Sequence, residues 1–489
     1  MVVEVDAPRS AAAPRRLVDR VLRPSWAGTA GLFVITAGWL IGVRPLADNS
    51  FLTHLATGRI ILDTGGVPSA DPYTFTAPGE PWVVQSWLVS LLYASAEALG
   101  GLDAVRLVTG LLAALLAGLA WTLLRPADGL VVRLGVMALV LAIGAQGWSE
   151  RPFMVGLICF AGTALALEGR LDPRWLVPLG WVWVNSHGSW PLGIVLVVAC
   201  AVGTRLDGGP PALELRCLRW GLLGMVFGAV GPLGFEVLWF PVHLLERREL
   251  LQGVVEWQAP AFEVGGQRAF LVQVALAVVL LARRPSYRGA VVVAVFTVAA
   301  LLGARNVTVA SLAFLPVMAP ALAGVGSLTS SARPPAARLT GVAALATLVV
   351  LSVARFDQAP LNLRRYPVGA LAYLEAHDVD TREVQMTSVD MVGNLVDYVY
   401  GPQQRTFYDD RFDMFPGDVS EAHLAVLLGR PSLRSDLDEL EIDLAVLMAG
   451  SPSTQILVGD PGWRALYVDD DWVLLCRRDS ELGGPIGSC

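Results

Sequence analysis

Polar side chains capable of acid–base or anion-binding chemistry gather at the ends of apolar segments in this sequence. The first is Asp48, in the polar stretch 44–87 just after the first long apolar run. A partly desolvated carboxylate at a membrane edge, near cations, can deprotonate an attacking hydroxyl or hold a metal ion. The alternative, left open by the sequence, is that Asp48 only caps a helix beginning near residue 50.

Two arginines indicate anion binding. Arg151 and Arg305 adjoin apolar runs on the face that we expect to lie outside the cytoplasm, where positive charge is disfavoured. A lipid phosphate would explain this placement, because arginine forms bidentate hydrogen bonds with phosphate. The alternative is a salt bridge from these arginines to Glu150 or Glu256.

Other polar groups in the same breaks complete the candidate site. Asn185 and His187 lie in the segment WVWVNSHGSW, where the alternative is an interfacial tryptophan belt with a hydrogen-bonded histidine. His54 is also a candidate for the site, but it could be an incidental surface residue. Asp71 is a further candidate, and the alternative is that it only begins a turn at Asp71–Pro72. With Asp48 as the candidate catalytic residue, the candidate substrate-binding residues are His54, Asp71, Glu150, Arg151, Asn185, His187, Glu256 and Arg305.

Several function classes lose support from the sequence. It lacks G-x-G-x-x-G, Walker, G-x-S-x-G and H-E-x-x-H patterns, which disfavours nucleotide, esterase and zinc-protease chemistry. The five cysteines show no C-x-x-C or Cys/His ligand spacing, so we expect neither a metal site nor a disulfide framework. A net charge of −7 and a pI near 5.4, without a clustered basic face, argue against nucleic acid as a partner.

The composition indicates which elements must position these residues. Hydrophobic residues make up 54% of the 489 residues and charged residues only 16%, whereas soluble domains average about 25% charged. Apolar runs close to the roughly 20 residues needed to span a bilayer recur along the chain. We therefore predict a polytopic α-helical membrane protein with about 11–12 membrane helices. The expected spans are 26–43, 104–124, 130–146, 152–167, 174–186, 189–204, 216–231, 269–282, 289–303, 307–325 and 339–354.

Arginine placement predicts the orientation of these spans. The Arg-rich segment 1–25 should be cytoplasmic, which puts the long loop 44–86 outside. If every expected span crosses, the later Arg-rich breaks all fall inside. If the segment Val83–Leu99 crossed, the later Arg-rich breaks would fall outside instead. The segment is also short for a full span, so we expect a half-inserted or interfacial helix there. A twelfth crossing with altered parity stays open.

The composition changes after Arg355, where acidic residues become frequent and apolar runs shorten. The chain thus divides into a membrane domain, 26–355, and a soluble domain, 356–489, which parity places outside the cytoplasm. Alternating helix and strand patterns predict an α/β domain. Asp409–Asp410–Arg411 ends one expected strand, at 404–409; a solvated strand end with a local ion pair is the simpler interpretation. The other expected strands are 383–389, 443–449, 464–468 and 472–477.

These features resemble a known superfamily. One span, a long outer loop beginning with an acidic residue, an in-plane helix and a Pro/Trp-led apolar segment are similar to the GT-C superfamily of polytopic glycosyltransferases. The segments WVNSHGSWPLG, VVEWQAP and GNLVDYVYGPQQRTFYDDRFDMFP also resemble a group of uncharacterised bacterial GT-C-like membrane proteins. The resemblance implies sugar transfer from a polyprenyl-phosphate donor to an extracytoplasmic acceptor, at the inner membrane of a bacterium, with Asp48 as the base.

The sequence leaves other functions open. Superfamily members often carry paired acids at this position, whereas Asp48 is followed by Asn49 and Ser50, which leaves the use of a divalent metal undecided. The main alternative is a non-catalytic membrane scaffold or lipid-binding protein whose outer domain recruits a partner. A transporter would need polar residues in broken helices at mid-membrane, whereas the spans here are polar mainly at their ends.

Overall fold

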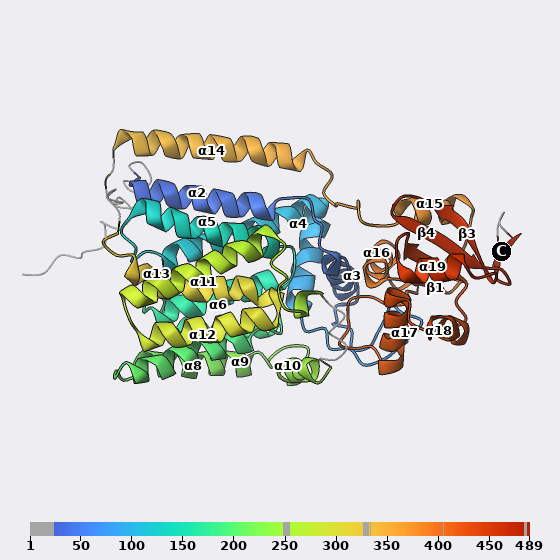
Figure 1. The fold of residues 1–489 in the computed structure, drawn as a ribbon, viewed down its shortest axis with the longest axis horizontal. Coiled ribbons are helices and arrows are strands. Elements are labelled where there is room, and N and C mark those ends of the chain that lie inside the picture. Colours follow the sequence, from blue (N-terminus) through green and yellow to red (C-terminus); the bar gives the residue numbers. More distant parts are fainter. Residues whose placement is uncertain (1–23, 248–254, 326–331, 333, 404, 484–486) are drawn as a thin grey trace, which may run out of the picture.

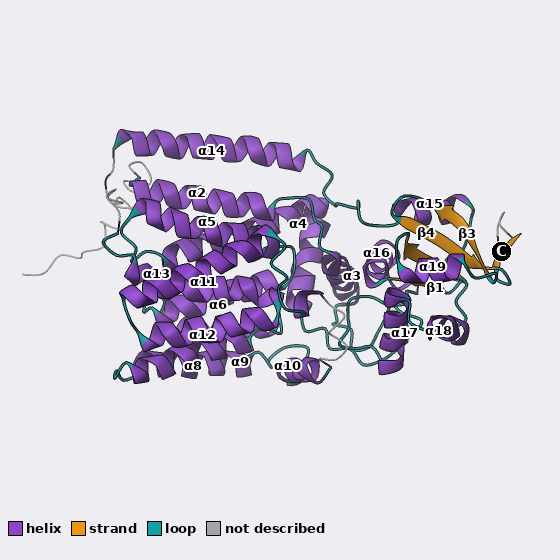
Figure 2. Cartoon of the chain, viewed as in Figure 1, coloured by secondary structure: helices purple, strands orange, loops and turns teal. Residues whose placement is uncertain are grey.

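The structure is a computed structural model that describes residues 24–247, 255–325, 332, 334–403, 405–483 and 487–489. It is mostly helical. A helix bundle holds most of the chain, and a small domain with a β-sheet lies at one end of the bundle (Figures 1 and 2). The predicted cytoplasmic segment 1–25 falls almost entirely outside the described residues, as does Arg333.

The bundle contains the expected apolar helices. Among the described residues, four are long and apolar enough to cross a membrane: α4 (Trp87–Leu123), α5 (Leu130–Gly147), α11 (Gly265–Arg283) and α14 (Pro335–Phe356). Shorter apolar helices are α2 (Trp26–Gly42), α6 (Phe153–Leu167), α8 (Pro191–Leu206) and α12 (Tyr287–Leu302). The bundle also includes α7 (Leu176–Val184), α9 (Ala212–Phe227) and α13 (Val307–Ala321). A further short helix, α10 (Glu236–Glu246), was not expected from the sequence.

Small residues allow the first helices to approach closely. A Cβ atom on Gly42 of α2 would lie 2.5 Å from the carbonyl oxygen of Thr109 in α4, and one on Gly110 would lie 2.5 Å from Val43. Glycines at such positions let helix backbones touch, which is how apolar helices associate where water supplies no driving force. The α2–α4 contact fixes the end of α2, and Asp48 follows that end directly.

A break at Gly100–Gly101 divides α4 into two parts. Gly101 has φ +64°, a left-handed conformation that glycine adopts without steric cost. The first part of α4 runs across the ends of the bundle helices and lies beside α3 (Asn49–Thr64), whereas the second part joins the bundle (Figure 1). The break falls between the segment Val83–Leu99 and the expected span 104–124.

Helix α3 is covered by protein on its apolar side. Its buried residues include Phe51, Leu52 and Leu55, and a Cβ on Gly58 would lie 2.0 Å from the carbonyl oxygen of Ser90 in α4. Helix α4 packs on this side of α3, and Thr53 of α3 donates a hydrogen bond (2.7 Å) to Asn394 of the C-terminal domain.

The C-terminal domain is an α/β layer structure. A four-stranded sheet has the order β1-β2-β4-β3, with β1 parallel to β2 and the other neighbours antiparallel. Its strands are β1 (Met386–Ser388), β2 (Leu444–Met448), β3 (Trp463–Val468) and β4 (Trp472–Arg477). Its helices are α15 (Val368–Ala376), α16 (Asp390–Tyr400), α17 (Gly417–Leu428), α18 (Leu433–Glu439) and α19 (Pro452–Val458). A two-stranded ribbon, β5 (Glu481–Gly483) with β6 (Gly487–Ser488), follows.

Both faces of this sheet are buried. Leu444 and Val446 of β2 pack in one cluster with residues of α15 and α16, and Ala445 and Leu447 pack in another with residues of α17, α18 and α19. The second cluster continues into Tyr73 and other residues of the loop 44–86. The sheet core therefore extends into the loop 44–86, and the C-terminal domain is packed against this part of the helical domain.

The strand expected at 404–409 does not join the sheet. This prediction was wrong, because the segment pairs with the outer loop instead, through an isolated bridge between Thr74 and Thr406. The amide of Thr406 donates to the carbonyl of Tyr73 (2.9 Å), and the amide of Phe75 donates to the carbonyl of Thr406 (3.0 Å). The strand-like sequence therefore supplies backbone hydrogen bonds between the two domains.

One disulfide bond corrects the expectation drawn from cysteine spacing. Cys476 in β4 is bonded to Cys489, 13 residues further along the chain. Cys159, Cys200 and Cys217 are free and buried in the helix bundle. The spacing of Cys476 and Cys489 matches no common motif, so only the return of the chain beside β4 reveals the pair.

Candidate functional site

Asp48 lies at the N-terminus of α3 and is held by two kinds of contact. Its side chain caps the helix, accepting a hydrogen bond from the amide of Ser50 (3.2 Å). The same carboxylate accepts from Nε of Arg151, at 2.6 Å to each oxygen, and from the hydroxyl of Ser149 (3.1 Å). The capping role and the pairing with Arg151 therefore coexist.

Glu150 binds the backbone next to Asp48 and does not pair with Arg151. Its Oε1 accepts hydrogen bonds from the amides of Ala47 and Asp48, the latter at 2.7 Å. The side chain is buried, and burial, followed by the nearby charge of Asp48, raises the pKa of Glu150. Glu150 thus positions the backbone that carries Asp48.

Arg151 links Asp48 to a second acidic residue. Its Nη1 forms an ion pair with Glu256, which lies in the 3-10 turn Val255–Trp257. Burial lowers the pKa of Arg151, but Asp48 and Glu256 more than offset this effect and the net shift is upward. The salt-bridge alternative considered for Arg151 is therefore present in the structure, with Asp48 and Glu256 as partners.

Arg305 is a cation beside this chain of ion pairs. It lies in the short turn between α12 and α13, with its guanidinium 4.3 Å from the ring centroid of Trp257 and 6.0 Å from that of Phe153. No carboxylate among the described residues forms a salt bridge with it. Burial lowers its pKa to about 10; Glu256 raises the pKa and Arg151 lowers it. This partly accessible guanidinium is thus without a paired anion in the described part of the chain.

The two predicted histidines lie close to these arginines and are neutral. Burial lowers the pKa of His54 to about 4, opposed by Asp48 and reinforced by Arg151. Burial, then Arg305 and His54, lower the pKa of His187 well below its usual value. Nδ1 of His187 accepts from the amide of Ser189 (3.0 Å), so the neutral ring carries its proton on Nε2. His187 can therefore donate a hydrogen bond to a ligand.

Asp410 completes the group, and it comes from the C-terminal domain. Its amide donates to Asn394 (3.2 Å), its side chain hydrogen-bonds Ser50, and its charge interacts with that of Arg151. Burial raises the pKa of Asp410 to about 7, against the effects of Ser50 and Arg151. From the sequence we expected a solvated strand end with a local ion pair; Asp409 and Arg411 do form an ion pair, but both are buried. The available signal was the Asp409–Asp410–Arg411 triplet, but nothing in the sequence placed it beside Asp48.

Seven residues therefore meet where the bundle adjoins the C-terminal domain. They come from the connections after α2, α5, α7 and α12, from the turn before α11, from α3 and from the C-terminal domain. We name them the Asp48 cluster: Asp48, His54, Arg151, His187, Glu256, Arg305 and Asp410.

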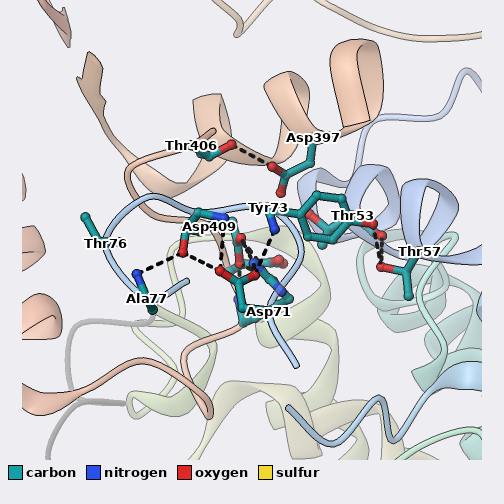
Figure 3. Close-up of polar contacts among 12 residues, drawn as sticks. Thr53, Thr57, Asp71, Tyr73, Thr76, Ala77, Asp397, Thr406 and Asp409 are labelled. Carbon is teal, nitrogen blue, oxygen red and sulfur yellow. Dashed lines mark hydrogen bonds and ion pairs between the residues drawn. The ribbon is translucent and has the colours of Figure 1, made fainter. Parts of the chain in front are cut away.

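Asp71 belongs to a different group, shown in Figure 3. Its carboxylate accepts from the amides of Tyr73 (3.1 Å) and Thr74 (2.9 Å), which is the turn expected as the alternative. It also pairs with Arg411 at 2.7 Å, and Arg411 pairs with Asp409 at 2.5 Å. Both carboxylates are fully buried. Asp71 thus joins the outer loop to the C-terminal domain and does not reach the Asp48 cluster.

Asp397 of α16 lies in the same buried group. It accepts from the hydroxyl of Thr406 (2.6 Å) through one oxygen, and its other oxygen has no hydrogen-bond partner (Figure 3). Burial, followed by the charge of Asp409, raises the pKa of Asp397 well above its usual value. We name Asp71, Asp397, Asp409 and Arg411 the Arg411 cluster; it joins the two domains.

Asn185 has a structural role. The side chain is buried, and its amide nitrogen donates to the carbonyls of Trp181 (2.9 Å) and Gly228 (3.0 Å). Its oxygen accepts from the indole of Trp87 (2.9 Å). These contacts satisfy the amide and connect the turn after α7 to the start of α4, so Asn185 has no group left for a substrate.

Within the described ranges, no group of three or more His, Cys, Asp or Glu side chains is arranged to hold a metal ion. The Asp48 cluster instead combines three carboxylates, two guanidiniums and two neutral imidazoles. Such a set can bind an anionic group and exchange a proton beside it. Comparison of the chain with known protein families and with curated proteins found no match.

Proposed function

We propose that this chain is a membrane glycosyltransferase that moves a sugar from a polyprenyl-phosphate donor to an acceptor outside the cytoplasm. The observation that carries the proposal is the guanidinium of Arg305. It lies beside the Asp48–Arg151–Glu256 ion pairs and has no paired carboxylate among the described residues. A partly buried arginine of this kind at the end of an apolar bundle favours a phosphate that arrives from the bilayer.

The proposal includes a topology. Eleven crossings, with the segment before α2 in the cytoplasm, place the Asp48 cluster and the C-terminal domain on the outer face of a bacterial inner membrane. The disulfide between Cys476 and Cys489 supports this side, because disulfides persist in oxidising compartments. The predominance of arginine at the opposite end of the bundle also agrees with it.

The residues of the Asp48 cluster then have separate roles. Arg305 binds the donor phosphate, and His187 and Glu256 contact the sugar or acceptor. An acceptor hydroxyl attacks the anomeric carbon; the new C–O bond forms as the bond to phosphate breaks, and the polyprenyl phosphate leaves. The hydroxyl proton passes to a carboxylate, for which Asp48 and Asp410 are the candidates. Arg151 holds Asp48 in place.

Two substitutions test the proposal. We expect Arg305→Gln to weaken binding of undecaprenyl phosphate about tenfold or more, because a charge-assisted contact is lost. Native mass spectrometry of the purified protein measures this binding, with Arg268→Gln as the control because Arg268 is exposed near the same end of the bundle.

Asp48→Asn tests catalysis separately. Asparagine caps a helix as well as aspartate, so the fold should persist while transfer of labelled sugar from membrane donors is lost. If Arg305→Gln binds undecaprenyl phosphate as well as the unmodified protein does, the donor class is wrong. Retained transfer in both Asp48→Asn and Asp410→Asn would exclude both carboxylates as the base. Absence of transfer by the unmodified protein would leave the lipid-binding scaffold as the better explanation.

A further inference from the structure

A second polar site lies at the other end of the bundle. There a cavity of about 260 Å³ is enclosed by residues of α6, α8, α11, α12 and α13 and of the turn between α11 and α12. The Asp48 cluster is at the opposite ends of these helices, so the two sites are separate (Figure 1). We propose that this cavity binds an anionic phospholipid of the cytoplasmic leaflet. The inference rests on the membrane topology proposed above, but not on the sugar-transfer chemistry.

Two arginines line the polar part of the cavity. Arg288 forms salt bridges with acidic side chains, whereas Arg284 does not. Arg288 pairs with Glu168 at 2.9 Å and with Glu214 at 3.5 Å, so two carboxylates more than neutralise its single positive charge. Arg284 donates to the carbonyl of Pro320 (2.9 Å) and forms no salt bridge with any described residue. An exposed arginine that lines a cavity and lacks an acidic partner favours an anionic group.

The rest of the wall is apolar. Leu196, Leu281, Val292 and Val317 line it together with Pro316 of α13. A soluble anion would gain nothing from these surfaces. An amphiphile with a charged head and an acyl chain would fill both the polar and the apolar part of the cavity. An unpaired arginine beside an apolar wall therefore indicates a lipid ligand.

The position along the helices fits the same ligand. Arg283 and Arg284 end α11 at the face that the positive-inside rule assigns to the cytoplasm. Anionic lipids concentrate in that leaflet, and basic pockets between membrane helices at this depth bind their head groups. A cationic ligand would be repelled by Arg284, and a neutral apolar molecule would leave its guanidinium unpaired.

Native mass spectrometry of the delipidated full-length protein tests the inference, using phosphatidylglycerol, phosphatidylcholine and inorganic phosphate as separate probes. We expect phosphatidylglycerol to bind best and Arg284→Gln to weaken it about tenfold. The matched control is Arg283→Gln, which removes the same charge from an adjacent exposed position that does not line the cavity. It should change binding little.

A second variant separates the head-group contact from the apolar part. Val317→Trp should block the cavity and lower binding of phosphatidylglycerol even though both arginines remain. The inference is overturned if Arg284→Gln and Arg283→Gln weaken binding equally, or if neither Arg284→Gln nor Val317→Trp does. Equal affinity for phosphatidylcholine would also overturn it. Full competition by inorganic phosphate would identify a free-phosphate site instead.

Discussion

The two carboxylates beside Arg151 have different surroundings. Asp48 is anchored at the start of α3 and accepts both contacts from Nε of Arg151. Asp410 is placed by its amide hydrogen bond to Asn394, and burial raises its pKa to about 7. A carboxyl group with a pKa near neutrality is suited to exchanging a proton at physiological pH. Asp410 is therefore as good a candidate for the proton acceptor as Asp48.

The raised pKa of Asp410 predicts the pH dependence of transfer. If Asp410 accepts the proton, it must first be ionised, so transfer should rise with pH through about 7. Asp410→Asn should remove this rise and lower the rate at pH 8 by at least a hundredfold. A rate profile of donor turnover between pH 5 and 9 measures both effects. An unchanged profile in Asp410→Asn would exclude Asp410 as the base.

Stability supplies a second readout for the same residue. The folded-state pKa of Asp410 is raised above that of an unfolded aspartate, about 3.9. Its contribution to stability is therefore fully present below about pH 4 and is lost as the pH rises through about 7. Asp410→Asn should flatten this part of the dependence of Tm on pH. A change at position 410 that acted only through packing would not alter the slope.

At the scale of elements, the loop 44–86 and the C-terminal domain are joined by the Arg411 cluster. Arg411 is buried between Asp71 and Asp409, and its guanidinium lies 4.4 Å from the ring centroid of Trp82. The bridge between Thr74 and Thr406 adds backbone hydrogen bonds at the same junction. These contacts fix the turn that carries Asp410, so the site depends on the docking of the two domains.

Removing Arg411 should therefore weaken this docking strongly. Arg411→Met leaves Asp71 and Asp409 buried without their cation, which costs about 3–5 kcal/mol for pairs of this kind. The Tm of the purified protein measures the loss. Arg382→Met is the matched control because Arg382 pairs with Asp380 at the exposed surface of the same domain and should change the Tm little. A triple variant with Asp71→Asn and Asp409→Asn should recover part of the stability.

At the scale of the whole molecule, the two ends of the bundle differ in chemistry. One end carries the Asp48 cluster and the C-terminal domain, and the other carries the cavity lined by Arg284 and Arg288 (Figure 1). The proposed topology assigns these ends to opposite sides of the membrane. A sugar donor and an anionic phospholipid would then bind in different leaflets.

Cysteine labelling tests this orientation. The free cysteines 159, 200 and 217 are buried, so background reaction should be low. A membrane-impermeant maleimide added to spheroplasts should label Ser435→Cys in the C-terminal domain but not Arg174→Cys at the other end of the bundle. Both positions are exposed. The reverse pattern would invert the topology, and labelling of Arg174→Cys after lysis shows that the site is reactive.

The sequence by itself determined the helical character, because apolar segments of membrane length separated by Arg, Gly and Pro leave few other structures in a bilayer. It also indicated an α/β domain after Arg355 and marked Asp48, Arg151 and Arg305 as chemically unusual. Glu256 and His187 were found through the same reasoning, since they too occupy breaks at one end. These inferences depend only on the order of apolar and polar residues within short segments, which can be read from the sequence.

The tertiary structure alone decided which of these residues meet. The side chain of Asp410 hydrogen-bonds Ser50, which lies more than 350 residues earlier in the chain. Asp71 pairs with Arg411 and not with the Asp48 cluster, and all polar groups of the Asn185 side chain bond to other parts of the protein. The segment 404–409 pairs with the outer loop because its partner is fixed by domain docking, and Cys476 meets Cys489 for the same kind of reason. Contacts between distant segments depend on how whole elements pack, and no local spacing in the chain encodes them.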